Sequence, residues 1–251
     1  MKYLIINADD FGLSPEVNEG IIRAWEKGGI TNATLMIKRE ATHEAIRFAR
    51  ENPSFPVGLH LDLDDLFGRD EIGEERFGIE RIGGMLKKDH FLDAVEAEIE
   101  GQIKAFKDSG LELTHLDGHH HLHALPDLFP LIVEKMLRHD IKTVRFSQSF
   151  DLVKYPPISW SDNFFNDMKG LLIKSGIGYA NYFIAGWKSY DLKRLKDGVT
   201  ELMTHPGTAE NWRMEELATL TCDEWREAIR EQGTTLISFK ELARQRRLER
   251  T

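Results

Sequence analysis

Hydrophobic and polar positions alternate along the chain between short apolar runs of strand length and longer runs with helical spacing. The first apolar run, residues 3–6, predicts a buried strand that leads into the acidic pair Asp9 and Asp10. Ser14 is then placed to cap a helix whose first position is Pro15, where the missing N–H of proline costs no hydrogen bond. The pattern therefore predicts that a strand and then a helix open the chain.

The same alternation continues to the end of the chain. Further strands are predicted at residues 30–37, 56–61, 113–116, 143–146, 182–184, 199–204 and 234–237. Further helices are predicted at residues 40–50, 89–109, 126–138, 164–174, 223–231 and 240–248. Irregular insertions are predicted near 62–88 and 147–187, the second of which includes one helix and one short strand.

Strand–helix alternation over the whole chain predicts an α/β protein with a mostly parallel sheet. The chain has 251 residues, seven or eight strand candidates and no linker rich in Gly, Pro or Ser. That combination favours a single (β/α) barrel domain spanning residues 1–251, with about seven parallel strands, over an open sheet. Neither a G-x-G-x-x-G motif nor a P-loop follows the first strand, so the nucleotide-binding folds lack their signature.

Composition and charge exclude several classes of protein. The 33 Lys and Arg residues against 42 Asp and Glu residues give a net charge of −9, which argues against nucleic-acid and membrane-surface partners. The single cysteine, Cys222, excludes an intramolecular disulfide and a cysteine-rich metal site. No apolar run is long enough for a membrane span or a signal peptide, so we expect a soluble cytoplasmic protein.

Polar residues recur where the predicted strands end. Asp9 and Asp10 follow the first strand, and His60, Arg145 and His205 lie at the ends of later ones. The carboxyl ends of barrel strands open on one face, so these side chains are expected to meet there. If the first strand continues through its acidic pair, the two carboxylates point in different directions and can hold two roles.

Taken singly, each of these residues also has an ordinary structural explanation. A pair of acids can form a turn or cap a helix, and a histidine at the end of a strand can be satisfied by one hydrogen bond. The guanidinium of Arg145 needs a carboxylate partner, which is either Asp9 or another acid in a plain salt bridge. His205, fixed by the Pro-Gly pair that follows it, can belong to a turn without chemistry.

Residues 115–123 (His-Leu-Asp-Gly-His-His-His-Leu-His) carry the strongest local signal, with five histidines in nine positions. Clustered neutral imidazoles most commonly bind metals. In an extended segment His119, His121 and His123 would share one side and His120 would face the other. One or two of the five histidines are expected to be ligands, and the others to support them, contact substrate or face solvent. The pattern assigns no role to His115, His121 or His123.

Four motifs, in order, resemble those of the YdjC-like (ChbG/HpnK-type) carbohydrate deacetylase family. They are residues 7–14 (Asn-Ala-Asp-Asp-Phe-Gly-Leu-Ser), 57–61 (Val-Gly-Leu-His-Leu), 115–123 and 204–207 (Thr-His-Pro-Gly). The first and third are specific, and together the four span nearly the whole chain. The resemblance implies a polysaccharide-deacetylase-like barrel and a hydrolase that removes N-acetyl groups from amino sugars or oligosaccharides.

The resemblance also implies roles for individual residues. Asp10, His60 and His119 would bind one divalent metal ion per chain, with Asp9 as catalytic base and His205 as general acid. Arg145 joins this catalytic set on its position alone, as the strand-end residue expected to hold Asp9. The family is described with Mg²⁺, whereas imidazole ligands also suit Zn²⁺, Mn²⁺ or Co²⁺. A homodimer is plausible for the family.

Two other functions remain open at this point. One is a metal-dependent phosphoesterase or amidohydrolase on a similar barrel, which would usually hold two metal ions. The other is a metal- or sugar-binding protein without turnover. The sequence does not indicate which sugar is the substrate. Aromatic residues crowd one third of the chain, where one or two could line a sugar site: Tyr155, Trp160, Phe164, Phe165, Tyr179, Tyr182 and Trp187.

Overall fold

Seven parallel strands form one sheet in the computed structural model, which describes residues 1–68, 77–146, 162–185 and 192–248. The order of strands is β4-β3-β2-β1-β6-β5, and β7 pairs with the start of β1. The strands are β1 (Lys2–Phe11), β2 (Asn32–Leu35), β3 (Val57–Leu61), β4 (Leu113–Gly118), β5 (Tyr182–Ile184), β6 (Gly198–Thr204) and β7 (Thr234–Leu236).

The sheet curls so that its two edges approach each other. Leu116 of β4 forms a parallel bridge with Val144, and Thr143 forms one with Gly178, which lies just before β5. The predicted strand at 143–146 is therefore present only as single bridges between the sheet edges. The prediction of an α/β fold with about seven parallel strands in a barrel is confirmed.

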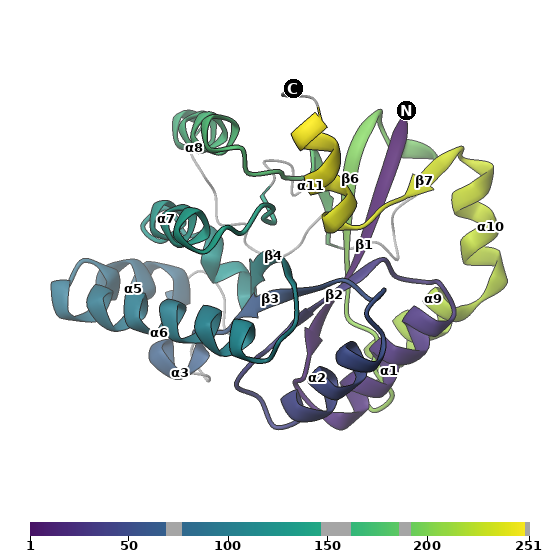
Figure 1. Cartoon of the computed structure of the whole chain (residues 1–251), viewed down its shortest axis with the longest axis horizontal. Coiled ribbons are helices and arrows are strands. Elements are labelled where there is room, and N and C mark those ends of the chain that lie inside the picture. The colour runs from purple at the N-terminus through teal and green to yellow at the C-terminus, as the bar shows by residue number, and fades with distance from the viewer. Residues whose placement is uncertain (69–76, 147–161, 186–191, 249–251) are drawn as a thin grey trace.

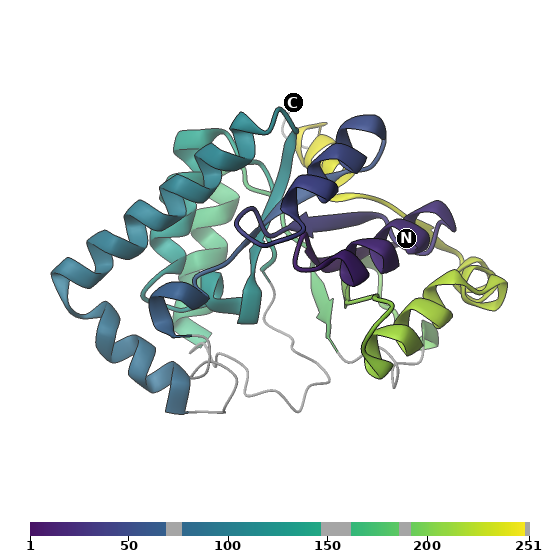
Figure 2. The same ribbon diagram turned by 90° about the horizontal axis from the view of Figure 1, so that it is seen from below.

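Helices surround the sheet (Figure 1). They are α1 (Pro15–Glu26), α2 (Thr42–Glu51), α3 (Asp64–Phe67), α5 (Phe77–Leu86), α6 (Asp89–Asp108), α7 (Phe129–His139), α8 (Asp162–Ser175), α9 (Asn211–Thr221), α10 (Asp223–Glu231) and α11 (Phe239–Leu248). Two 3₁₀ helices, η1 (His119–Ala124) and η3 (Leu192–Arg194), complete the described elements. Figure 2 shows α5–α8 along one side of the sheet and α1, α9 and α10 along the other.

Burial on both faces explains why the strands read as apolar runs. Residues 4–11 of β1 are all buried, and β1 extends beyond the predicted run to include the two acids. The predicted start of α1 is confirmed, because Ser14 accepts a hydrogen bond from the backbone N–H of Val17 and Pro15 opens the helix. Among the described residues, no helix is long and apolar enough to cross a bilayer.

Some elements differ from the prediction for identifiable reasons. The described part of 62–88 contains α3 and α5, and the three glycines of α5 weaken its helical signal. Helix α9 was not predicted, because its buried face includes the charged residues Arg213 and Glu216 and so lacks an apolar stripe. Residues 147–161 and 186–187 of the second predicted insertion lie outside the described residues.

Candidate metal centre

The two acids of β1 border the same histidine although they are neighbours in the chain. In pairing with β2, β1 holds one extra residue between Ala8 and Phe11, which is a β-bulge. Asp10 lies in this bulge with a positive φ of 70°. A regular strand would turn Asp9 and Asp10 to opposite faces, whereas here each has an oxygen within 4.8 Å of a His60 nitrogen.

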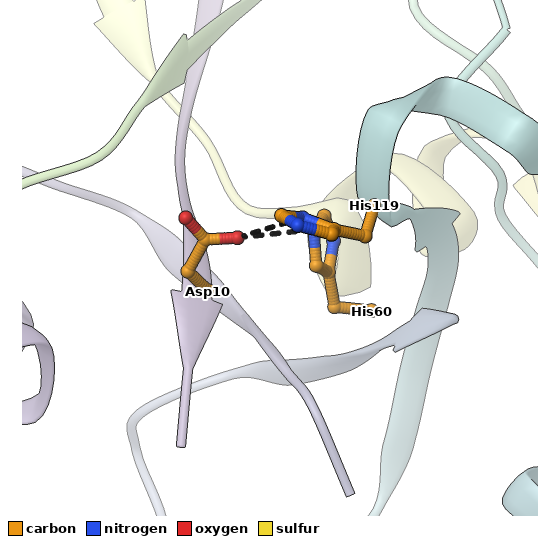
Figure 3. Close-up of side chains that lie close together, drawn as sticks. All are labelled: Asp10, His60 and His119. Carbon is orange, nitrogen blue, oxygen red and sulfur yellow. Dashed lines mark ion pairs between the residues drawn. The ribbon is translucent and has the colours of Figure 1, made fainter. Parts of the chain in front are cut away.

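Side chains from three segments converge beside this bulge (Figure 3). Asp10 comes from β1, His60 from β3, and His119 from the start of η1 directly after β4. One oxygen of Asp10, Oδ1, lies 3.4 Å from Nε2 of His60 and 3.2 Å from Nδ1 of His119. Within the described part of the chain, this buried Oδ1 has no hydrogen-bond partner. A buried carboxylate oxygen that lacks a hydrogen bond and faces two imidazole nitrogens fits a divalent cation.

The second oxygen of Asp10 is held by Arg213 of α9. The guanidinium donates to Oδ2 at 2.7 Å, so Oδ1 alone remains for a cation. Burial by itself would raise the pKa of Asp10, but the imidazoles of His119 and His60 outweigh it and hold that pKa well below its usual range. The carboxyl is therefore ionised, as a metal ligand must be.

His60 is oriented by a buried carboxylate. In the pairing of β3 with β4, His60 lies opposite Asp117, and its Nδ1 is 2.7 Å from Asp117 Oδ1. Burial alone would raise the pKa of Asp117, but the charges of Arg145 and His60 outweigh burial and hold that pKa far below its usual range. The Asp117 carboxylate favours a proton on Nδ1 and leaves Nε2 of His60 facing Asp10 and the candidate cation site.

The histidine-rich segment is not extended, so the predicted alternation of its side chains is wrong. It forms the 3₁₀ helix η1, with His120 and His121 at positive φ of 51° and 58°. This turn directs His119 toward Asp10 and places the His120 ring against the His119 ring, tilted by 49° with 4.0 Å between centroids.

Of the other histidines in this segment, His115 and His123 are buried in the interior. His115 contacts Asn7 Oδ1 through Nε2 at 3.0 Å and stacks on Phe239, and burial lowers its pKa to about 3. Burial likewise lowers the pKa of His123 to about 4, and its Nε2 lies 3.2 Å from the carbonyl oxygen of Arg145. Both rings are therefore neutral at ordinary pH. His121 lies edge-on to a phenylalanine ring of β5.

Asp9 is bound at both oxygens by Arg145. Nη1 donates to Oδ2 and Nη2 to Oδ1, each at 2.7 Å, and the Asn7 side-chain amide donates to Oδ1 at 2.8 Å. Nη2 of Arg145 also lies 2.9 Å from Asp117, and Nε donates to Glu201 of β6 at 2.7 Å. One buried guanidinium thus joins three carboxylates from β1, β4 and β6.

His205 follows β6 directly and lies at the edge of this cluster. Its backbone N–H donates to Glu216 at 2.5 Å, and its ring meets the Trp212 ring edge-on at 5.6 Å. The His205 imidazole is close enough to Asp10 to contribute to the lowered pKa of that carboxyl. The structure thus brings Asp9, the three predicted ligands and Arg145 into one cluster and places His205 beside it.

Two further groups of side chains could hold a metal ion. Asp9, His60 and Asp117 form one, but the Arg145 guanidinium already neutralises both carboxylates. The other consists of Asp64, His119 and His120, and here Arg39 forms an ion pair with Asp64 at 3.4 Å. Arg213 also lies beside Asp10 but binds only Oδ2, and the pKa of Asp10 is held below its usual range, whereas burial raises the pKa of Asp64. A carboxylate ligand must be ionised, so the group around Asp10 is the strongest candidate.

A cavity of about 770 Å³ lies elsewhere in the molecule and shares none of these residues. Its lining includes Thr31, Val57 and Thr114, at or near the starting ends of β2, β3 and β4. The candidate chemistry is at the opposite ends of the strands, where active sites of parallel barrels are built.

Comparison with known proteins agrees with this geometry. A family model described as YdjC-like protein matches residues 3–231. The chain belongs to the YdjC-like family. A relative from Brevibacillus brevis named carbohydrate deacetylase is 33% identical over 95% of this chain and 99% of its own. A chitooligosaccharide deacetylase from Enterobacter sp. is 31% identical over 96% of this chain and 99% of its own.

A solved structure has the same fold. An Enterococcus faecalis protein described as a cellobiose-phosphate cleavage protein superposes with a TM-score of 0.70. The superposition covers 96% of the YdjC-like chain and 98% of the other, with 24% sequence identity. At that identity the likeness concerns the fold alone.

Several residues of the YdjC-like site were not singled out from the sequence. Asp117 was noted only as part of the histidine cluster, and Asn7 only within a motif. Glu201 and Arg213 were not identified at all. A buried acid within the apolar run of β6 was the available signal for Glu201, whereas Arg213 lies on a helix that the pattern does not predict.

Proposed function

We propose that this chain is a metal-dependent carbohydrate deacetylase that hydrolyses the N-acetyl group of an amino sugar or oligosaccharide. The names of its relatives support the reaction class, and the alignments with these relatives cover nearly all of both chains. The observation that carries the proposal is the buried Oδ1 of Asp10, which lacks a hydrogen bond and faces two imidazole nitrogens, beside a second acid that Arg145 binds at both oxygens.

In this proposal Asp10, His60 and His119 hold one divalent ion, and three protein ligands leave coordination positions open. When bound there, such an ion supplies Lewis acidity toward an amide carbonyl and makes a water more acidic. One oxygen and two nitrogen donors suit Zn²⁺, Mn²⁺ or Co²⁺, and the family resemblance adds Mg²⁺. The identity of the ion is part of the test below.

Asp9 acts as the general base. Its carboxylate borders His60, so it lies within reach of a water at the cation site. The two hydrogen bonds from Arg145 fix its orientation and keep it off the ion, which leaves it able to accept a proton. Arg145 is thus a positioning residue for the base.

His205 acts as the general acid. An amine is a poor leaving group unless it is protonated, so a proton donor is needed across the site from the base. The turn that carries His205 is packed tightly against α1, where Gly20 meets the backbone of Pro206 and Gly207. Packing of this turn fixes the position of His205.

A hydrolase with two metal ions is the second candidate, and one observation favours it. Asp64, His119 and His120 bring three donor atoms within 4.8 Å of one another next to the first group. A phosphoesterase or amidohydrolase of this kind would bind two ions per chain, whereas the deacetylase proposal requires one.

The test is acetate release from N-acetylated chitooligosaccharides by the protein loaded with Zn²⁺, Mn²⁺, Co²⁺ or Mg²⁺ in turn. Asp9→Asn should lower kcat by roughly 10²–10⁴-fold, the contribution of a general base, and retain one bound ion per chain. Asp108→Asn, a matched change at an exposed acid, should behave as the wild type. No acetate release with any of these ions, or full activity in Asp9→Asn, would refute the proposal.

A further inference from the structure

An exposed tryptophan stands at the edge of the metal centre. Trp212, in the first turn of α9, keeps 44% of its surface exposed, whereas Trp225 on the next helix is buried. Single exposed apolar residues are common on proteins and need no explanation by themselves. The position of this indole and the side chains that hold it are what point to a ligand.

Two contacts place the indole next to the proposed chemistry. Its ring centre is 5.6 Å from the ring centre of His205, at an interplanar angle of 65°. The guanidinium carbon of Arg213 lies 4.4 Å from the Trp212 ring centre, and the same guanidinium binds Asp10 at 2.7 Å. One side chain therefore separates the indole from the candidate metal ligand.

The support beneath the indole is rigid. Arg213 is buried, and its guanidinium is fixed by Asp10, by Glu210 at 2.5 Å and by the carbonyl oxygen of His205 at 3.5 Å. A cation stacked on an indole is an attractive contact in its own right. The Trp212 ring is thus held in place before any ligand arrives, which lowers the entropic cost of binding to it.

The chemistry of such a surface fits a sugar ring. A pyranose has faces lined by C–H groups, whose partial positive charge is attracted to the negative face of an indole. Ligand sites typically combine such an apolar surface with a few polar groups that fix orientation, here His205 and the metal centre. A small charged substrate without an apolar face would gain little from the exposed indole.

Resting on the proposed deacetylase function, we propose that Trp212 is a sugar-binding residue whose indole stacks on a pyranose ring of the N-acetylated substrate. The stacked ring binds the sugar beside the metal centre and His205 and contributes affinity equally before and during the reaction. Trp212 lies outside the aromatic-rich stretch in which the sequence suggested a sugar site, and in that stretch Phe165 and Tyr179 are buried in the core.

Kinetics on the metal-loaded enzyme test this role, with N-acetylglucosamine disaccharide as substrate. Trp212→Ala should raise KM about tenfold, the size of one aromatic contact, and leave kcat unchanged, because stacking is made equally in ground and transition states. Trp212→Phe should restore most of the affinity. Met214→Ala removes an exposed apolar side chain from the same helix and should match the wild type.

A binding measurement separates this inference from the proposed function. Calorimetric titration of the same disaccharide is carried out in an Asp9→Asn background, with and without Trp212→Ala. A roughly tenfold weaker affinity in the double variant supports stacking even where the wild type releases no acetate. Equal affinities would overturn the inference and leave the proposed deacetylation intact. A fall in kcat at unchanged KM would also overturn it, because it would mean that Trp212 only supports His205.

Discussion

Asp9 and Asp10 occupy adjacent positions, yet each binds a different arginine. Arg145 takes both oxygens of Asp9, whereas Arg213 takes only Oδ2 of Asp10 and leaves Oδ1 facing His60. The two arginines thus give the acids different surroundings: Asp9 has both oxygens bound to Arg145, whereas Asp10 has one oxygen directed to the candidate cation site. This difference is the physical basis for giving them different roles, as base and as ligand.

Glu201 provides a prediction at the scale of the single residue. Burial raises its pKa from 4.5 to about 7, although Arg145 favours the charged form. Between those values the folded protein holds a proton that the unfolded chain has released, so this group makes stability fall as pH rises. Over the whole interval the loss is about 3 kcal/mol.

The measurement is urea unfolding of metal-free wild type and Glu201→Gln from pH 4.5 to 8. The free energy of unfolding of the wild type should fall relative to that of the variant as pH rises through this range. Glu134→Gln, at an exposed acid of α7, is the control and should run parallel to the wild type. A difference between wild type and Glu201→Gln that does not change with pH would contradict the prediction.

At the residue scale, the sequence identified site residues where an acid or a histidine follows the end of a predicted strand. Asp10, His60 and His119 were chosen on that basis with the family resemblance, and the structure brings them together, while their roles remain predictions. Asp117 and Arg213 were not given roles, because their importance lies in which atoms they meet. Such contacts between distant segments leave no local pattern in the sequence.

At the scale of elements, register and bulges decide which side chains meet. Pairing of β3 with β4 sets His60 opposite Asp117, and the bulge in β1 brings both acids to His60. Neither feature has a local signature, since a shift of one residue leaves the apolar run unchanged. The same limit applies to η1, where two positive φ values replace the extended segment expected from alternation.

Packing of α1 against the turn after β6 gives a prediction at this scale. A Cβ on Gly20 would come within 2.4 Å of the backbone of Gly207, so α1 and the turn carrying His205 cannot both keep their places. Gly20→Ala should lower the free energy of unfolding by about 1–3 kcal/mol and reduce kcat more than metal affinity.

Gly101→Ala is the matched control, because nothing lies within 4 Å of a Cβ at that helical position. It should leave kcat unchanged and stabilise the protein by about 0.5–1 kcal/mol, since alanine favours a helix more than glycine does. Urea unfolding and steady-state kinetics of both variants make the comparison. Equal stability of the two variants would contradict the prediction, because it would mean that the turn at Pro206 and Gly207 moves aside without loss of stability.

At the scale of the whole molecule, the parallel barrel gathers residues from positions 9 to 205 at one end of the sheet. The alternation of strands and helices was sufficient to predict this architecture, because burial of parallel strands on both faces imposes apolar runs of fixed length. The sequence did not predict that residues 143–144 close the sheet through single bridges to Leu116 and Gly178. So short a pairing has no apolar run of its own and depends on the two segments on either side of it.

Metal binding should stabilise the whole chain, because an ion that binds only the folded state adds its binding free energy to stability. At a hundredfold excess over Kd the gain is about 2.7 kcal/mol, which raises Tm by roughly 5–10 °C for a chain of this size. Chelation should reverse the shift in the wild type. His119→Ala, measured by the same thermal scans, should lose most of it, and an undiminished shift would place the ion elsewhere.

The most direct test of the central claim is anomalous X-ray diffraction from crystals soaked in Mn²⁺. We expect one peak per chain, coordinated by Asp10 Oδ1, a His60 nitrogen and a His119 nitrogen, with Asp9 outside the coordination sphere. A peak between Asp64 and His120 alone, two peaks of equal height, or none near Asp10 would contradict the claim that three distant segments meet to bind a single ion.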